Sequence, residues 1–234
     1  MFGFFKRLFD IIFSIIALVV LSPVLFVICI ILLFTGEHEV FYFQERIGYK
    51  CKKFYIWKFA TMVKNSSNMG TGMLTIRKDP RVLPFGRFLR RTKMNELPQL
   101  VNVLKGDMSV IGPRPMVQKT FEAFPESLRY KVYDSYPGLS GVGSIIFRDE
   151  EDLVSRAKDP IVFYDEYIQP YKAELEVWYN ANKSFSVDSL LIFLTVWELF
   201  ASKNVIIYSI FKTLPRKDLE KDLINFNIRC NINK

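Results

Sequence analysis

An uninterrupted apolar run near the N-terminus constrains the fold of this chain more than any other feature. From Ile11 to Phe34 the sequence contains 24 residues and no charge. In a helix, at about 1.5 Å per residue, such a run spans roughly 36 Å, which is enough to cross a bilayer. The sequence therefore predicts a protein that is attached to a membrane by its N-terminal segment.

The centre of this run contains Ser22 followed by Pro23. Proline removes a helical hydrogen bond and clashes with the preceding turn, so a sharp bend is expected there. Basic residues flank both ends, with Lys6 and Arg7 before the run and several more between residues 46 and 53. Since positive flanks favour the cytoplasm, we favour a re-entrant helix-break-helix over a single spanning helix. Its freed backbone groups need a partner such as Ser22.

The composition limits the classes of protein that remain. A chain of 234 residues with 50% hydrophobic residues forms one sizeable core, which predicts one domain plus attachments. Three scattered cysteines and one histidine exclude a disulfide framework and multi-histidine metal sites. The net charge of +8 suits anionic lipid or phosphorylated substrates. With a membrane segment present, we expect no nucleic-acid partner.

Hydrophobic patterns predict the elements that follow the membrane segment. Residues 40–48 and 53–59 alternate as two short strands with a turn at Gly48. Residues 137–147 predict a glycine-punctuated loop that runs into a strand.

The C-terminal third of the chain is predicted to be helical, from about residue 148 to residue 200. Its last segment, residues 187–200, is too short to span a bilayer, and both an interfacial position and burial against the domain remain open. Residues 215–234 are polar and predict a loosely ordered tail.

The stretch RRTKMNELPQL, residues 90 to 100, predicts the start of a helix. Apolar residues between positions 97 and 104 recur at helical spacing, and Asn95 is a favourable N-cap. As structure, Asn95 could be replaced by Asp without consequence. As chemistry it could not, because a neutral amide is a poor nucleophile and a poor cation ligand. Asn95 and the adjacent Glu96 are the candidate catalytic residues.

Several motifs in this order and spacing resemble one known family, the bacterial sugar transferases, which are also called monotopic phosphoglycosyl transferases. The central block of 30 residues is highly specific, and the resemblance covers about residues 1 to 148. The matching pieces are KRLFD at 6–10, LSP at 21–23, the strand pair ending in KF, GRFLRRTKMNELPQLVNVLKGDMSVIGPRP at 86–115 and PGLSG at 137–141.

The resemblance implies an α/β fold, mostly helical with a small sheet, at the cytoplasmic face of the bacterial inner (plasma) membrane. Family members move a phosphosugar from a nucleotide diphosphate sugar to polyprenyl phosphate, with magnesium. An Asp attacks phosphorus and the neighbouring Glu helps to hold the metal. The expected organisation is a re-entrant membrane helix at 1–36, a catalytic core at 37–148, a helical, partly interfacial extension at 149–214 and a flexible tail at 215–234.

This chain departs from the family pattern at three places around the expected site. Asn95 holds the place of the attacking Asp. Ala60 stands in KFATM where the family usually has KFRTM. Residues 138–148 have become apolar except for Arg148.

We therefore favour a glycosyltransferase that moves the sugar alone onto a hydroxyl of a polyprenyl-diphosphate-linked acceptor, in bacterial glycoconjugate assembly. Such a displacement needs no enzyme nucleophile and no covalent phosphosugar-enzyme, only a base and positive charge for the leaving diphosphate. Glu96 would be the base or a ligand of Mg²⁺. The candidate phosphate-binding residues are Lys58, Arg90, Arg91, Arg114 and Arg148.

Two alternatives remain open. One is phosphosugar transfer onto polyprenyl phosphate with a substitute for the missing Asp. The other is a non-catalytic membrane partner that docks on an active enzyme. A homodimer is also left open.

Overall fold

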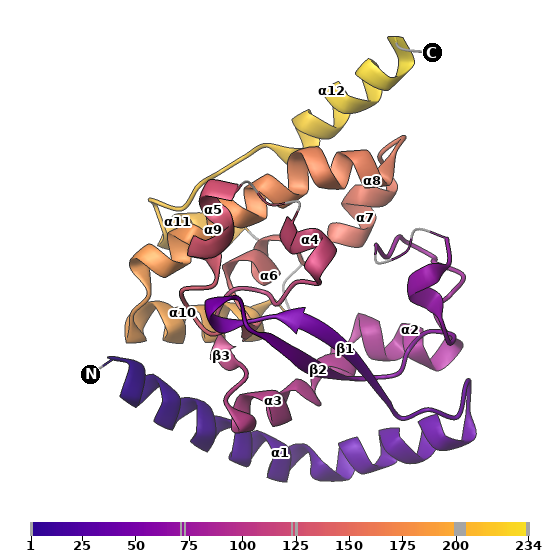
Figure 1. The fold of residues 1–234 in the computed structure, drawn as a ribbon, viewed down its shortest axis with the longest axis vertical. Coiled ribbons are helices and arrows are strands. Elements are labelled where there is room, and N and C mark those ends of the chain that lie inside the picture. Colours follow the sequence, from indigo (N-terminus) through magenta and orange to yellow (C-terminus); the bar gives the residue numbers. More distant parts are fainter. Residues whose placement is uncertain are drawn as a thin grey trace.

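The computed structural model describes residues 2–70, 72, 74–122, 124, 126–198 and 205–232. Two two-stranded sheets lie among helices, as expected for a mostly helical α/β chain (Figure 1). The strands are β1 (Phe41–Ile47), β2 (Lys53–Phe59), β3 (Ser109–Ile111) and β4 (Gly138–Ser140). The α-helices are α1 (Phe2–Phe34), α2 (Pro84–Arg91), α3 (Gln99–Lys105), α4 (Gln118–Glu122), α5 (Glu126–Val132), α6 (Val142–Ile146), α7 (Glu150–Ser155), α8 (Pro160–Phe163), α9 (Gln169–Asn182), α10 (Phe185–Trp197), α11 (Val205–Ile210) and α12 (Leu219–Ile232).

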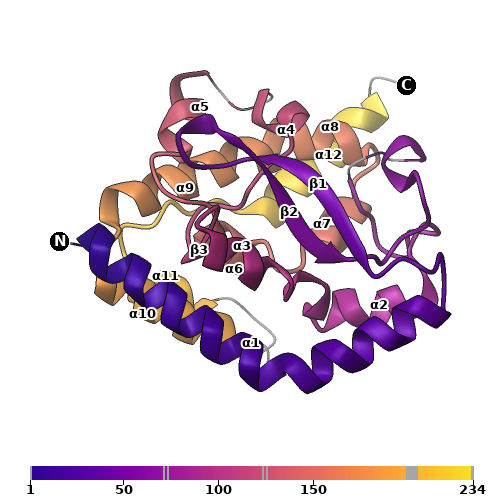
Figure 2. The ribbon, with the colours of Figure 1, turned by 60° about the horizontal axis from the view of Figure 1, so that its bottom comes forward.

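The apolar run forms α1, which is long and apolar enough to cross a membrane. The expected helix-break-helix is wrong in one respect, because the helix continues without interruption through Pro23. It is nevertheless bent near its middle, and Figure 2 shows both halves against the body. Pro23 frees the carbonyl four residues before it, that of Val19. The Ser22 hydroxyl donates to this carbonyl at 2.8 Å, so the freed group has the expected partner.

The N-terminal end of α1 is joined to the body by Lys6. Its ammonium group forms an ion pair with Asp188 of α10 and donates to the carbonyl of Ile111 in β3 at 3.0 Å. The Tyr179 hydroxyl of α9 donates to the other carboxylate oxygen of Asp188 at 2.8 Å. Both partners of the ion pair are largely buried, with 16% and 10% of their side chains exposed. Lys6 is therefore turned into the body.

The next turn of α1 adds three further hydrogen bonds to the body. Arg7 donates to the carbonyls of Val103 and Leu104, the latter at 2.7 Å, at the C-terminal end of α3. Cations are favourable at this end of a helix because the last carbonyls lack helical partners. Asp10 accepts a hydrogen bond from the backbone N–H of Val110 at 3.0 Å. Lys6, Arg7 and Asp10, hereafter the polar anchor, thus attach the helix to three other elements.

The C-terminal half of α1 is held by apolar contacts instead. Ile28 and Leu32 are buried in one cluster with Phe59 of β2 and Leu89 of α2. Between the two attached ends, the middle of the helix faces away from the body, and Val20 is 68% exposed.

The predicted strand pair is confirmed as the antiparallel hairpin β1–β2, with Gly48 at the turn. Asn102 of α3 fixes this hairpin to the helix. Its side-chain oxygen accepts from the N–H of Trp57 at 2.9 Å, and its amide donates to the carbonyl of Tyr55 at 2.8 Å.

The strand expected at the end of residues 137–147 is wrong. The chain forms only the short strand β4, parallel to β3, and then turns into α6. The turn depends on close backbone contact, since a Cβ atom at Gly141 would lie 2.2 Å from the carbonyl oxygen of Gly112. A short apolar run such as that at 145–147 is buried equally well as helix or strand, so its pattern alone does not separate the two.

The predicted helical C-terminal third is confirmed from α7 to α10. Helix α10 is half buried: Leu191 and Leu194 face the core, whereas Phe193 is 57% exposed. Leu199 and Phe200, at the end of the predicted segment, lie outside the described residues. The loosely ordered tail is a wrong expectation for residues 219–232, which form α12 with Phe226 packed on Phe163.

The buried ion pair of the polar anchor gives a first prediction. Asp188→Ala should destabilise the protein by about 3 kcal/mol or more, because Lys6 is left buried without its carboxylate. For a chain of this size the thermal midpoint should fall by roughly 6 to 12 °C, measured by circular dichroism in detergent micelles.

The matched control is Glu45→Ala, which removes the exposed ion pair with Lys53. Exposed pairs contribute less than about 1 kcal/mol, so this midpoint should change little. Equal shifts in the two variants would contradict the role of the polar anchor.

Candidate active site

The Asn95–Glu96 pair lies in a short 3-10 turn, Met94–Glu96, that precedes α3. Lys93 opens the turn in the left-handed conformation, with φ 59, and its carbonyl accepts from the N–H of Glu96 at 3.1 Å. A non-glycine residue in this region of backbone space is often found at functional sites.

Asn95 does not cap α3, so that expectation is wrong. Helix α3 begins only at Gln99, and no side-chain cap bond is present at its start. Asn95 is 7% exposed, and its side-chain oxygen is buried without a hydrogen-bond partner in the described part of the chain. An unpartnered buried acceptor lowers stability. Helix capping therefore gives no reason for an asparagine at this position.

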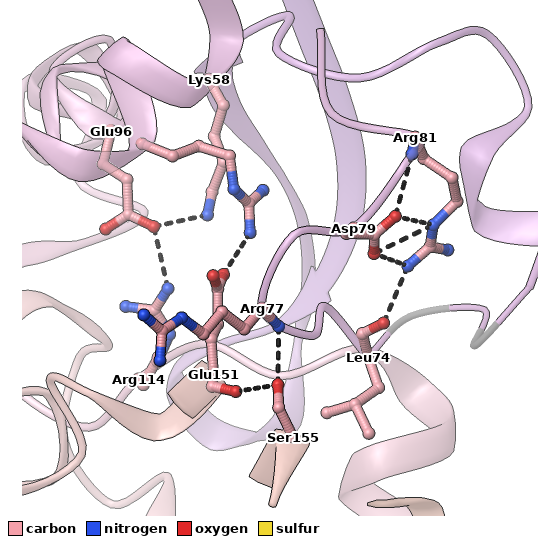
Figure 3. A network of polar contacts seen from close by, with 10 residues as sticks. Lys58, Leu74, Arg77, Asp79, Arg81, Glu96, Arg114, Glu151 and Ser155 are labelled. Atoms are coloured by element: carbon pink, nitrogen blue, oxygen red, sulfur yellow. Dashed lines mark hydrogen bonds and ion pairs between the residues drawn. The ribbon is translucent and has the colours of Figure 1, made fainter. Parts of the chain in front are cut away.

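Glu96 is the centre of the site (Figure 3). One of its carboxylate oxygens accepts from Lys58 of β2 at 2.7 Å and from Arg114 at 2.8 Å. Burial alone would raise the pKa of Glu96, but Arg114 and Lys58 outweigh it and hold this pKa well below its usual range. A carboxylate of this kind is a poor proton acceptor, so the geometry argues against Glu96 as a general base.

Lys58 is affected in the opposite direction. Burial lowers the pKa of its ammonium group to about 8, although Glu96 partly offsets this effect. Glu96 therefore favours the cationic form of Lys58, against burial and the neighbouring arginines.

Arg46 is a residue of the site that the sequence reasoning assigned only to the membrane flank. It lies on β1, donates to the carbonyl of Pro115 at 3.1 Å and lines a small polar recess with Lys58, Gln99 and Arg114. Burial and the nearby Arg114 lower the pKa of Arg46 to about 10. The sequence could have indicated this position, because residues 44, 46 and 58 are polar and fall on the same face of the predicted hairpin.

The other predicted phosphate-binding residues are not brought to Glu96. Arg90 forms an ion pair with Glu151 of α7 at 2.6 Å, and Arg91 is exposed at the end of α2. Arg148 follows α6 and lies near Glu198, where its charge partly offsets a rise of the Glu198 pKa to about 7 that burial causes. Among the predicted cations, the structure thus gathers Lys58 and Arg114 at the candidate acid.

Glu176 of α9 lies beneath this arrangement and was not foreseen. Its carboxylate accepts from the backbone N–H groups of Arg114 and Gly143, and burial raises its pKa to about 8. A Cβ atom at Gly143 would lie 2.5 Å from the Glu176 carboxylate. Glu176 therefore ties the loop that carries Arg114 to the start of α6.

The charges present do not fit a resident Mg²⁺ ion held by Glu96. Magnesium in phosphoryl-transfer sites is usually held by one or two carboxylates together with substrate phosphates and water, so the charge around Glu96 decides the fit. Arg46, Lys58, Lys93 and Arg114 all act electrostatically on the single carboxylate of Glu96. A bare cation would be repelled, whereas phosphate oxygens would be attracted.

An excess of positive charge in a recess, in a chain that also has a long apolar helix, is typical of membrane-bound enzymes that act on phosphorylated substrates. The chain belongs to the bacterial sugar transferase family, whose family model matches residues 1–202.

Three relatives illustrate the match. The chain is 35% identical to the UDP-glucose:undecaprenyl-phosphate glucose-1-phosphate transferase of Escherichia coli, over 85% of this chain and 40% of the relative. It is 32% identical to the undecaprenyl-phosphate galactose phosphotransferase of Salmonella typhimurium, over 82% of this chain and 40% of the relative. It is 31% identical to the exopolysaccharide production protein ExoY of Sinorhizobium fredii, over 83% of this chain and 84% of the relative.

The chain thus spans about two fifths of the length of the first two relatives and most of the third. It shares the family's N-terminal apolar helix, which is long and apolar enough to cross a membrane. The first two names describe transfer of a sugar phosphate, which favours the phosphosugar alternative over the glycosyltransferase that we favoured from the sequence.

The coupling of Lys58 to Glu96 gives a second prediction. Glu96→Gln removes the charge that raises the pKa of Lys58, so this pKa should fall below about 8. Lys58 should then react with an amine-acylating reagent at lower pH, as followed by competitive labelling across a pH series and peptide mass spectrometry. Lys64, whose side chain is 55% exposed, is the internal control, and the extent of its labelling should be the same in both proteins. An unchanged Lys58 midpoint would mean that Glu96 does not maintain its charge.

Proposed function

We propose that this protein transfers a sugar 1-phosphate from a nucleotide diphosphate sugar to a polyprenyl phosphate in the membrane. The observation that carries the proposal is the double contact of Lys58 and Arg114 with Glu96, at 2.7 and 2.8 Å. This double contact holds the pKa of Glu96 low and makes it a poor base. A hydroxyl acceptor needs a base to remove its proton, whereas a lipid phosphate is already an anion.

The reaction proceeds by direct displacement, because Asn95 cannot serve as the attacking group. An oxygen of the lipid phosphate forms a bond to the phosphorus that carries the sugar. The bond from this phosphorus to the bridging oxygen breaks, and the nucleoside monophosphate leaves with the electron pair. Arg114 and Lys58 stabilise the negative charge that develops on the phosphoryl oxygens. Glu96 is a positioning residue that holds these two cations together.

A second candidate is transfer of the sugar alone onto a lipid-linked hydroxyl, with release of the nucleoside diphosphate. The replacement of the attacking Asp by Asn95 favours it, since displacement at the sugar carbon needs no enzyme nucleophile. The two reactions release different nucleotides, and a non-catalytic partner releases neither.

The identity of the released nucleotide distinguishes these candidate functions. Purified protein in lipid nanodiscs, given polyprenyl phosphate and a panel of nucleotide sugars, should release nucleoside monophosphate. Intact-protein mass spectrometry during turnover should show no phosphosugar adduct, because position 95 carries an amide. Release of nucleoside diphosphate would select the second candidate, and a covalent adduct would overturn the direct displacement.

We also propose that α1 is re-entrant, with both of its ends at the cytoplasmic face. The polar anchor attaches one half of α1 to the body, and Ile28 and Leu32 attach the other half to the same body. A body of this size lies on one side of a bilayer, so both ends of the membrane segment lie on that side. The basic flanks favour the cytoplasmic side.

Cysteine labelling tests this topology. In a variant without the three native cysteines, Gly3→Cys and Ser127→Cys should both resist an impermeant maleimide in cells with a permeabilised outer membrane. Both positions should label once the inner membrane is opened. Labelling of one position and not the other in sealed cells would show a spanning helix.

A further inference from the structure

A cavity of about 250 Å³ lies between the C-terminal end of α1 and the start of α2. Leu32, Ala60, Leu83 and Phe85 contribute its apolar walls. An apolar cavity of about 150 Å³ is enough for a benzene molecule, so this one accommodates roughly five to ten carbon atoms. The cavity is thus the size of one or two branched five-carbon units.

One end of the cavity meets the membrane segment. Leu33 and Phe34, at the end of α1 beside the cavity, are 49% and 78% exposed. Apolar side chains of this size at the end of a membrane helix contact lipid. A hydrocarbon chain therefore reaches the cavity from the bilayer without crossing water.

One wall of the cavity is formed by a residue close in the chain to the candidate active site. Ala60 follows Lys58 by two residues at the end of β2, which corresponds to about 7 Å along an extended chain. Met94, the first residue of the 3-10 turn that carries Glu96, packs in the same apolar cluster as Leu32 and Phe85. Packed apolar side chains thus lie between the cationic recess and the cavity.

We propose that this cavity binds the isoprenyl units next to the phosphate of the polyprenyl acceptor. The proposal rests on the function proposed above and adds a location for the lipid chain. The charges set the direction of binding. Lys58 and Arg114 attract the phosphate at one end, whereas Glu37 and Glu39 line the cavity nearer the end of α1 and disfavour an anionic head group there.

Ala60 controls the space that is available. Its methyl group lines the cavity and is 8% exposed, so a longer side chain would project into the space for the lipid.

Photo-crosslinking tests where the chain binds. The probe is a polyprenyl phosphate with a diazirine in its first isoprene unit, in nanodiscs of phosphatidylethanolamine and phosphatidylglycerol. Peptide mass spectrometry should place the label at Ala60 or within residues 83–86, and excess undecaprenyl phosphate should compete it. Labelling confined to the exposed middle of α1, or no saturable labelling, would overturn the proposal. Labelling competed only by added phospholipid would assign the cavity to a bilayer acyl chain and also overturn it.

Substitution of Ala60 provides the second measurement. Ala60→Leu should weaken competition by undecaprenyl phosphate roughly tenfold, since this corresponds to lost burial of about two methylene groups. Val19→Leu is the control, because it enlarges an apolar side chain at the 67% exposed middle of α1. Equal competition in both variants would contradict the proposal. If Ala60→Leu does not fold, the label map of the unsubstituted protein decides the question.

The two proposals fail in different ways. Saturable labelling of the cavity without any nucleotide release would retain the lipid site and overturn the transferase. Normal release of nucleoside monophosphate with labelling elsewhere would retain the transferase and overturn the cavity.

Discussion

The attachment of an apolar helix to a water-soluble body is the constraint on which this structure depends. Helix α1 offers lipid a nearly continuous apolar surface, so specific polar contacts with the body are confined to its first turns. There, Lys6, Arg7 and Asp10 reach α10, α3 and β3. Arg7 binds the carbonyl end of α3, and the opposite end of α3 follows the turn that carries Glu96. One short helix thus connects the membrane attachment to the candidate site.

The site itself has more positive than negative charge. Lys58 and Arg114 share one oxygen of Glu96. Arg46 is near enough that Arg114, together with burial, lowers its pKa, while Glu96 partly offsets this effect. Such a recess is stabilised when phosphate oxygens enter it, since they neutralise cations that a single carboxylate cannot. The buried side-chain oxygen of Asn95 lowers the stability of the folded chain, because it has no hydrogen-bond partner in the described part of the chain and does not cap α3.

Local patterns predicted the local features well. The alternation in residues 40–48 and 53–59 gave the hairpin, and the Ser22–Pro23 step gave the bend with its hydrogen-bond partner. The apolar run at 145–147 was misassigned because it is too short for its period to be informative. Residues 219–232 were misassigned because two buried side chains, Leu223 and Phe226, are enough to hold a polar helix on the core. Local sequence patterns do not predict contacts between residues that are far apart in the chain. Lys58 and Glu96 are 38 residues apart, and no local pattern indicated that Glu176 contacts the backbone of Arg114.

The hydrogen bond from Ser22 to Val19 has a consequence for how the protein reaches the membrane. The bend in α1 satisfies its own freed carbonyl within three residues, so it needs no contact from α3, β3 or α10. Those elements are synthesised later, and during translation the N-terminal segment exists before they do. The segment can therefore enter the bilayer already bent, and the body then folds onto a helix whose shape is set. As far as this hydrogen bond is concerned, the bend of the N-terminal segment and the folding of the body do not depend on each other.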